Sequence, residues 1–242
     1  MDAKLIDVMG DDLRVVNAAR VSFSKESEWE WDSRESGYGG ERTVLSEKDQ
    51  KLIKYLAKHN HWTPFSHVQI TMREKVPIFV ARQRFKHMVG FTYNEVSRRY
   101  VDDPPEFFNP KEWRKKSENK KQGSSSELIN QVRYWDPIVG PDEHWVDIEE
   151  FVHRHHHDCL WVYQSLINEG VAPEQARMVL PQSMYTEYYV TGSLAAWARA
   201  YLLRIDPHAQ KEIQDLASQW NKNISSIDTL KYSWSALIGK ET

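Results

Sequence analysis

Residues 82–99 read RQRFKHMVGFTYNEVSRR and form the densest polar segment of the sequence. The segment holds five cationic side chains, one histidine and one glutamate. Arginine offers a planar fork of donors that matches a phosphate, and serine hydroxyls or turn N–H groups can complete an anion site. A solvated, charged helix followed by a turn is the alternative interpretation. The break at Gly90 and the tight polar cluster at 94–99 favour a phosphate-binding site.

Around this segment, the spacing of apolar residues predicts a chain in which helix predominates. An aspartate cap predicts a first helix near 11–20, and a serine cap predicts a second over 46–59. Further helices are expected over 78–85, 148–169, 195–203 and 208–220 and from residue 172, with strands over 68–72 and between 182 and 191. Segments 24–41 and 111–126 are predicted to be surface excursions of a single domain over 1–242, the second a mobile or ligand-ordered loop.

The composition excludes several classes of protein. The chain has 242 residues, a net charge of −3 at pH 7 and 40% hydrophobic residues, which is typical of a globular protein without a basic surface for nucleic acid. No apolar run approaches the roughly 20 residues of a membrane-spanning helix, and the first residues do not resemble a signal peptide. A single cysteine cannot form an intramolecular disulfide. We therefore expect a cytoplasmic protein with no nucleic-acid or membrane partner.

Two features on the predicted helix at 148–169 are open to a chemical interpretation. His153 and His157 have the spacing of a two-histidine metal half-site, but no third ligand stands at the expected offset. No metal site is therefore predicted, and a solvated or interface helix face is the favoured alternative. Cys159 follows on the same helix, where the expected role is that of a small buried hydrophobic side chain.

The second half of the opening segment carries a family resemblance. Residues 94–100 read NEVSRRY, which resembles the signature of the flavin-dependent thymidylate synthases, enzymes that use FAD and no cysteine nucleophile. The family's Arg-His-Arg triplet, followed by seven residues and a serine, is replaced by Lys86-His87-Met88, followed by eight residues and Ser97. Other family phrases are resembled, in order, by residues 7–12, 18–23, 59–67, 176–181 and 203–210.

The resemblance implies a set of site residues. Positions that match the family's contacts to dUMP, mainly to its phosphate, are occupied by Gln83, Lys86, Glu95, Ser97, Arg98, Arg99, Arg177 and Arg204. Of these, Arg204 and Ser97 are the implied catalytic residues, and Arg204 would favour the N3-ionised form of the uracil ring. Positions that match contacts to FAD are occupied by Thr63, Lys86, His87, Met88, Glu95, Ser193, Arg199 and His208.

Some of these positions depart from the family pattern. Ser193 and Ala195 stand where the family often has asparagine and arginine, and Met88 carries no charge. The resemblance therefore implies either weaker flavin binding or a substitute cation, for which the candidates are Arg82, Arg84 and Arg199.

Arg204 also has a purely structural interpretation. A guanidinium at the end of an apolar helix, just before Pro207, is commonly a partner of the last helical carbonyls or of a neighbouring acid such as Asp206. The resemblance instead places Arg204 against the uracil ring.

The resemblance finally implies a fold, an activity and partners. The implied fold is α+β, helix-rich with a small antiparallel sheet, and the active sites would be shared between the subunits of a homotetramer. The implied reaction converts dUMP to dTMP, with methylenetetrahydrofolate as carbon donor and FAD reduced by NADPH as hydride source. The alternatives are a variant enzyme that hydroxymethylates the pyrimidine or accepts UMP, and a non-catalytic nucleotide-binding module that has lost FAD.

Overall fold

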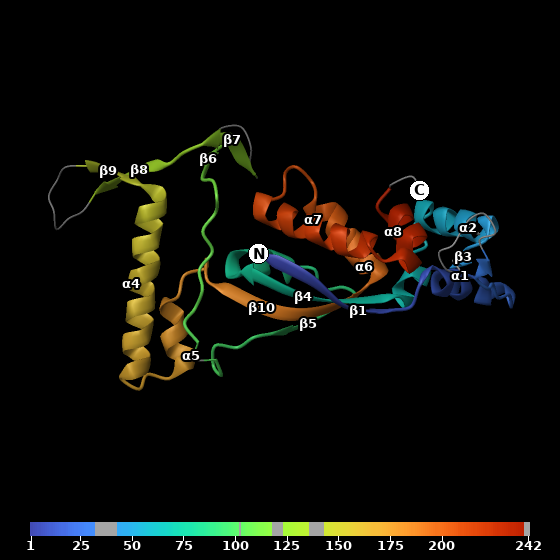
Figure 1. Ribbon diagram of the computed structural model, residues 1–242, viewed down its shortest axis with the longest axis horizontal. Coiled ribbons are helices and arrows are strands. Elements are labelled where there is room, and N and C mark those ends of the chain that lie inside the picture. The colour runs from blue at the N-terminus through green and yellow to red at the C-terminus, as the bar shows by residue number, and fades with distance from the viewer. Residues whose placement is uncertain (32–42, 102, 118–122, 136–142, 240–242) are drawn as a thin grey trace, which may run out of the picture.

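The centre of the structure is a four-stranded antiparallel sheet in the order β1, β4, β10, β5 (Figure 1). A computed structural model describes residues 1–31, 43–101, 103–117, 123–135 and 143–239. The sheet strands are β1 (Asp2–Met9), β4 (Gln69–Pro77), β5 (Phe91–Glu95) and β10 (Tyr185–Ser193). Helices cover one face of this small sheet and pack at one end of it, so the prediction of a helix-rich α+β fold is confirmed.

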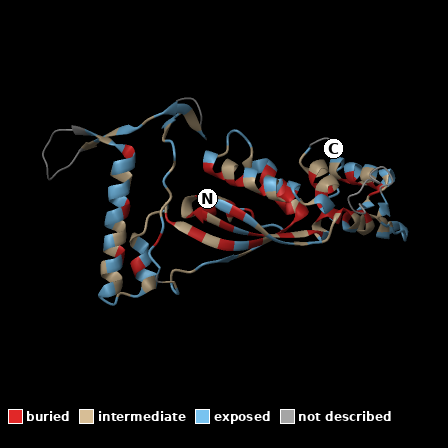
Figure 2. Cartoon of the chain, in the orientation of Figure 1, coloured by how far each residue is buried: buried red, intermediate tan, exposed pale blue. Residues whose placement is uncertain are grey.

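One face of the sheet is covered by α6 (Leu194–Arg204) and α7 (Lys211–Ser225), as Figures 1 and 2 show. Along β4, buried residues alternate with more exposed ones, as expected for a strand with one covered face. Ile70 and Met72 are fully buried members of the core on this side. Glu74 occupies the next buried position, so a carboxylate lies inside the core and needs a partner there.

Three further helices pack together at one end of the sheet: α1 (Asp12–Arg20), α2 (Glu47–Lys58) and α8 (Lys231–Leu237). The first two begin where the sequence predicted. The carboxylate of Asp11 accepts the N–H of Arg14 at 2.7 Å, and the hydroxyl of Ser46 accepts the N–H of Asp49 at 3.2 Å. Both are N-caps that satisfy a free helix donor.

The helix α4 (Ile148–Asn168) stands away from the sheet, at the opposite end of the molecule from α2 (Figure 1). The predicted helix and its C-terminal cap are confirmed, because Gly170 has a φ of +81° in the left-handed region. The other short elements are β2 (Glu30–Trp31), β3 (Thr43–Val44), α3 (Ile78–Arg84), β8 (Gln131–Trp135), β9 (Glu143–Asp147), α5 (Pro173–Ala176) and the 3-10 turns Val21–Phe23, Pro64–His67, Arg177–Val179 and Asp228–Leu230.

Parts of the two predicted excursions differ from expectation. The loop expected at 111–126 contains most of a hairpin, in which β6 (Arg114–Lys116) pairs with β7 (Ser124–Leu128). Its base is fixed because Arg114 donates to Ser124 and to Glu212 of α7. Of the excursion at 24–41, residues 32–41 lie outside the described residues, as do residues 118–122 of the hairpin.

One predicted helix boundary and one predicted burial also need correction. The last predicted helix begins at residue 211 rather than 208, because the N–H of Ala209 donates to the carbonyl of Asp206 at 2.9 Å and forms a turn first. Cys159 is half-buried rather than buried, since α4 leaves this side uncovered. Its Sγ lies 3.6 Å from Nε2 of His155.

Two observations concern metal ligands and membrane-spanning helices in the described ranges. No group of three or more potential metal ligands occurs there, and His153 and His157 are exposed. No helix in these ranges combines the length and the apolar character needed to cross a bilayer.

Candidate functional site

The segment 82–99, which carries the family motif phrases, leaves α3, turns at Gly90 and enters the edge strand β5. Residues Phe91–Glu95 of the segment 82–99 form this strand. Gly90 has a φ of +80°, and a Cβ built there would lie 2.9 Å from Cβ of Ala196, so a larger residue would strain this turn. The hydroxyl of Tyr93 accepts a hydrogen bond from Arg84 at 2.6 Å and donates to the carbonyl of His87 at 2.7 Å. Tyr93 thus ties the two ends of the turn together.

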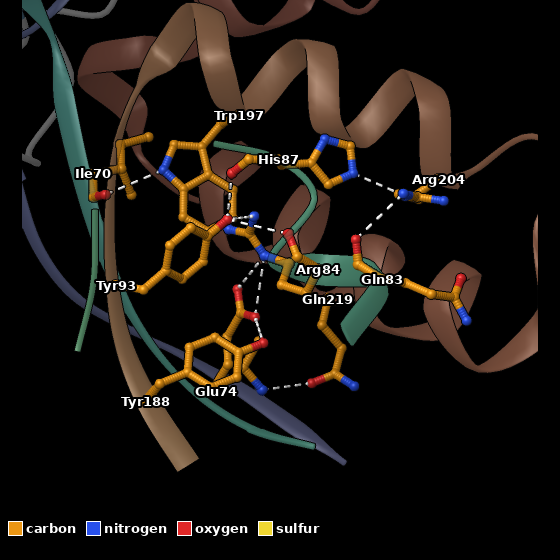
Figure 3. A network of polar contacts seen from close by, with 11 residues as sticks. Ile70, Glu74, Gln83, Arg84, His87, Tyr93, Tyr188, Trp197, Arg204 and Gln219 are labelled. Atoms are coloured by element: carbon orange, nitrogen blue, oxygen red, sulfur yellow. Dashed lines mark hydrogen bonds and ion pairs between the residues drawn. The ribbon is translucent and has the colours of Figure 1, made fainter. Parts of the chain in front are cut away.

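Arg84 is the buried anchor of this turn (Figure 3). Its side chain and that of Glu74 are fully buried, and its Nε lies 3.3 Å from a Glu74 carboxylate oxygen. Tyr188, directly opposite Glu74 in the sheet, donates its hydroxyl to the same carboxylate at 2.5 Å. The guanidinium also lies 4.8 Å from the ring centroid of Trp197. Because it is enclosed in this way, Arg84 is wrong as a candidate substitute cation for flavin.

Arg204 points from the end of α6 towards the motif turn rather than towards its own helix (Figure 3). Its Nε donates to Nε2 of His87 at 2.8 Å, and its Nη2 donates to the carbonyl of Gln83 at 3.3 Å. Asp206 is paired with His208 instead, at 2.9 Å. The structural interpretation of Arg204 as a partner of its helix end or of Asp206 is therefore wrong.

The His87 ring is suited to hold Arg204 because it is neutral. Burial and the neighbouring cations Arg204, Arg84 and Arg199 lower the pKa of His87 to about 4. A neutral imidazole keeps one nitrogen as an acceptor, which an arginine N–H can use. Arg204, Gln83 and His208 line an open cavity of about 490 Å³, and Nη1 of Arg204 has no partner among the described residues. The arrangement leaves a fixed cation free to meet a ligand.

A second cavity, of about 640 Å³, gathers Glu95, Ser97, Arg98 and Arg177. Arg98 donates to the carbonyl of Asp103, and Arg177 donates to the carbonyl of Glu174 at 3.3 Å. Neither guanidinium pairs with a carboxylate of a described residue, so both can still bind an anion.

The acidic residues around this second cavity have other partners. Glu95 accepts from Thr186 at 2.6 Å, and Glu106 pairs with Lys75 at 2.8 Å. Arg99 lies outside this lining, where its Nε is 3.2 Å from the hydroxyl of Ser97 and its guanidinium lies over the ring of Tyr100.

A third cavity, of about 520 Å³, contains two of the positions implied for flavin. Arg199 and Ser193 line it together with Gly90, Ala195 and the exposed ring of Trp62. The hydroxyl of Ser193 already caps α6 by accepting the N–H of Ala196 at 3.2 Å. Arg199 donates to the carbonyl of Val89, next to the motif triplet. Of the three candidate substitute cations, it is the one that lines this cavity.

The remaining implied positions lie outside these three cavities. Thr63, Lys86 and Met88 are exposed, and 74% of Met88 is open to solvent. The predicted site residues of one chain are thus distributed over three separate pockets and positions outside them. Reasoning from the sequence missed Glu74, Tyr93, Gln210 and Glu212. Only Glu74 had a local signal, since it continues the buried alternation of β4.

Comparison with known proteins identifies the family. A family described as thymidylate synthase complementing protein matches residues 4–228. The chain is 38% identical over 231 residues to the flavin-dependent thymidylate synthase of Thermosipho africanus, covering 96% of this chain and 87% of that protein. The chain belongs to the flavin-dependent thymidylate synthase family. The resemblance found in the motif phrases is therefore confirmed.

Another member of the family and a solved structure are also similar to this chain. A flavin-dependent thymidylate synthase of Thermus thermophilus is 36% identical over 214 residues, covering 88% of this chain and 67% of that protein. A crystal structure of the UMP/dUMP methylase PolB from Streptomyces cacaoi, bound with 5-Br dUMP, superimposes with a TM-score of 0.74. The two share 26% sequence identity, with 99% of this chain and 95% of that chain covered.

Proposed function

We propose that this protein is a flavin-dependent thymidylate synthase that converts dUMP to dTMP. Methylenetetrahydrofolate is the proposed carbon donor, and NADPH the proposed reductant of FAD. The observation that carries the proposal is the position of Arg204, which a neutral His87 and the carbonyl of Gln83 hold beside the family motif. Family membership supports this assignment.

Arg204 and Ser97 are the proposed catalytic residues. A fixed guanidinium at the uracil edge stabilises negative charge that develops on the ring as it is activated. Ser97 and Arg98 lie with Arg177 in the cavity that suits a phosphate, and Arg99 touches the hydroxyl of Ser97. These residues bind and orient the nucleotide phosphate, while Gln83 and Glu95 contact the nucleotide nearby.

The residues around the third cavity fit a flavin in their chemistry. Arg199 supplies a cation for the diphosphate, Trp62 an exposed ring for stacking, and Gly90 a backbone that a ligand can approach closely. Ser193 adds a hydroxyl to this cavity. Thr63, Lys86, His87, Met88, Glu95 and His208, which lie outside it, complete the proposed set of flavin contacts. When bound, FAD supplies the hydride chemistry that no side chain of the protein can provide.

The separation of the pockets supports a shared active site. The cavity with Arg98 and Arg177 has no lining residue in common with the cavity of Arg204. A nucleotide that contacts both cavities would take its phosphate-binding residues from one subunit and Arg204 from another. We therefore propose a homotetramer with active sites between subunits.

A variant activity is the second candidate. Its support is the structural similarity to a UMP/dUMP methylase, together with the exposed, uncharged Met88 in place of a motif arginine. In this case UMP would be accepted or a hydroxymethyl group added. A non-catalytic nucleotide-binding module that has lost FAD is the third.

The absorbance of the purified protein tests the proposed function. We expect a flavin band that NADPH bleaches and that returns when dUMP and methylenetetrahydrofolate are added together without oxygen. A colourless protein that FAD cannot reconstitute would contradict the proposal and support the binding module instead.

Replacing the cysteine should leave the reaction intact. Cys159→Ala should keep nearly all turnover, because the flavin route needs no enzyme thiolate. Burial and the charge of Asp158 raise the pKa of Cys159, which also makes it a poor nucleophile. Steady-state turnover of dUMP checks this, with flavin content measured in parallel. Loss of turnover in a folded, flavin-loaded variant would refute the mechanism.

The two arginines of the second cavity should determine nucleotide affinity. Arg98→Ala and Arg177→Ala should each weaken dUMP binding by about 10- to 100-fold, since each removes a charge-assisted contact to phosphate. Titration calorimetry of the flavin-loaded protein measures this. Arg154→Ala is the matched control, because Arg154 is exposed on α4 and lies 4.0 Å from Glu150. Unchanged dUMP affinity in both cavity variants would show that the phosphate binds elsewhere.

A further inference from the structure

One tyrosine hydroxyl connects the buried ion pair of the core to the histidine that holds Arg204 (Figure 3). Tyr93 lies on β5, and its hydroxyl accepts a hydrogen bond from Nη1 of Arg84 at 2.6 Å. The same hydroxyl lies 2.7 Å from the carbonyl of His87 and 3.2 Å from that of Arg84. Nε2 of His87 in turn accepts from Arg204 at 2.8 Å. Four residues thus link the interior of the protein to the cavity that contains Arg204.

The direction of the bonds at Tyr93 follows from the chemistry of Arg84. A guanidinium donates hydrogen bonds and accepts none, so Arg84 uses the oxygen of the phenol and leaves its proton for a carbonyl. Burial raises the pKa of Tyr93 to about 12, so the hydroxyl keeps this proton near neutral pH. Of the two carbonyls within reach, that of His87 is the closer. Tyr93 is therefore a fixed donor to His87.

The backbone of His87 is held on both sides. Its N–H donates to the carbonyl of Arg84 at 3.1 Å, and its carbonyl accepts from Tyr93. No other described residue donates to this carbonyl. Without the hydroxyl, the carbonyl side of His87 would lose its only partner in the described part of the chain, and the ring would no longer start from a fixed backbone position.

We propose that Tyr93 is a positioning residue of the reaction, whose hydroxyl keeps His87 where its ring can hold Arg204 against the uracil. The inference rests on the proposed function, since it assumes that Arg204 activates the pyrimidine. A shift of the His87 ring lengthens its 2.8 Å bond to Nε of Arg204 and frees the guanidinium to rotate. Misplacement of a catalytic group by about 1 Å can lower a rate by about a hundredfold.

Tyr93→Phe tests the proposal because it removes the hydroxyl and keeps the ring, which packs 5.0 Å from the ring of Phe85. We expect kcat for dUMP to fall about tenfold while the dUMP dissociation constant changes at most about threefold. A loosely held cation still attracts the nucleotide but stabilises the transition state less. Steady-state turnover and calorimetric titration of the flavin-loaded protein measure the two quantities.

Tyr188→Phe is the matched control. It removes another hydroxyl from the same buried group, where Tyr188 donates to Glu74 at 2.5 Å, and it leaves the contact between Tyr93 and His87 in place. Both variants should lower the thermal unfolding temperature, but only Tyr93→Phe should lower kcat. An equal fall in kcat in Tyr188→Phe would show that turnover follows the stability of the core, and would overturn the proposal.

A double variant tests whether Tyr93 acts through Arg204. In the Arg204→Ala background, Tyr93→Phe should change kcat by less than about twofold, because a positioning residue has no effect once the residue that it positions is absent. A merely structural hydroxyl would lower kcat in both backgrounds alike. A further tenfold fall in the Arg204→Ala background would therefore overturn the proposal.

A second background keeps the test valid should Tyr93→Phe fold poorly because Arg84 loses an acceptor. In Arg84→Met with Glu74→Leu that donor is absent, and adding Tyr93→Phe removes only the contact to His87. The tenfold fall in kcat should persist relative to this background. An unchanged kcat there, with dUMP still converted, would overturn the role of Tyr93 alone. If the flavin-loaded wild-type protein converted no dUMP, the proposed function would fail together with this inference.

Discussion

Arg204→Ala should lower kcat by about a hundredfold or more while the protein keeps its fold and its flavin. The guanidinium is held in place by His87 and by the carbonyl of Gln83, so it needs no rearrangement when charge develops on the uracil ring. An interaction that strengthens in the transition state affects turnover more than substrate binding. Loss of a single donor to a developing oxyanion has an effect of this size in other enzymes.

Two further measurements separate this role from a structural one. Arg204→Lys should recover little activity, because a point charge cannot keep the contact to His87 and also reach the ligand through a planar fork. The thermal unfolding temperature and flavin content of both variants should stay near those of the wild-type protein. Normal turnover in a folded variant with bound flavin would show that Arg204 does not activate the substrate.

Arg84→Met should destabilise the fold by about 3–5 kcal/mol. The substitution keeps an apolar stem among the aromatic rings but leaves the carboxylate of Glu74 buried without its cation. Urea unfolding, followed by circular dichroism, measures the loss in free energy of unfolding. Arg73 on β4 pairs with Glu187 on β10 at the surface of the same sheet, so Arg73→Met is the matched control and should cost at most about 1 kcal/mol.

A double variant distinguishes the ion pair from simple packing. Arg84→Met with Glu74→Leu removes both buried charges and should recover much of the lost stability, because apolar side chains of similar size often replace such pairs without cost. Equal unfolding free energies for Arg84→Met and the wild-type protein would contradict the buried-anchor role. The same result would also mean that Arg84 does not hold the turn at Gly90 in place through Tyr93.

The helices were predictable where their signals are local. Asp11 and Ser46 cap the helices that follow them, and Gly170 ends α4, so each of these boundaries depends on residues within one turn. The hairpin at β6–β7 was not predictable in this way. It is held by the contact of Arg114 with Glu212, two residues 98 positions apart, and no local sequence pattern predicts such a pair.

The candidate site shows the same division. The phrase at 94–100 identified the family and named residues that the structure does gather, such as Ser97 and Arg98 in one cavity with Arg177. It could not show that Arg84 is buried and paired with Glu74, nor that the side chain of Gln83 donates to Gln210, 127 positions away. These contacts arise from the packing of α3 against β4 and α7, which is settled only when the whole core forms.

The central claim is tested most directly by the mass of the product nucleotide. The protein is incubated with dUMP, FAD, NADPH and methylenetetrahydrofolate, and the nucleotide is analysed by mass spectrometry, with UMP in a parallel reaction. The account predicts that dUMP gains one methyl group in place of a hydrogen and elutes with dTMP. A product that carries a hydroxymethyl group, or dUMP recovered unchanged from flavin-loaded protein, would contradict it.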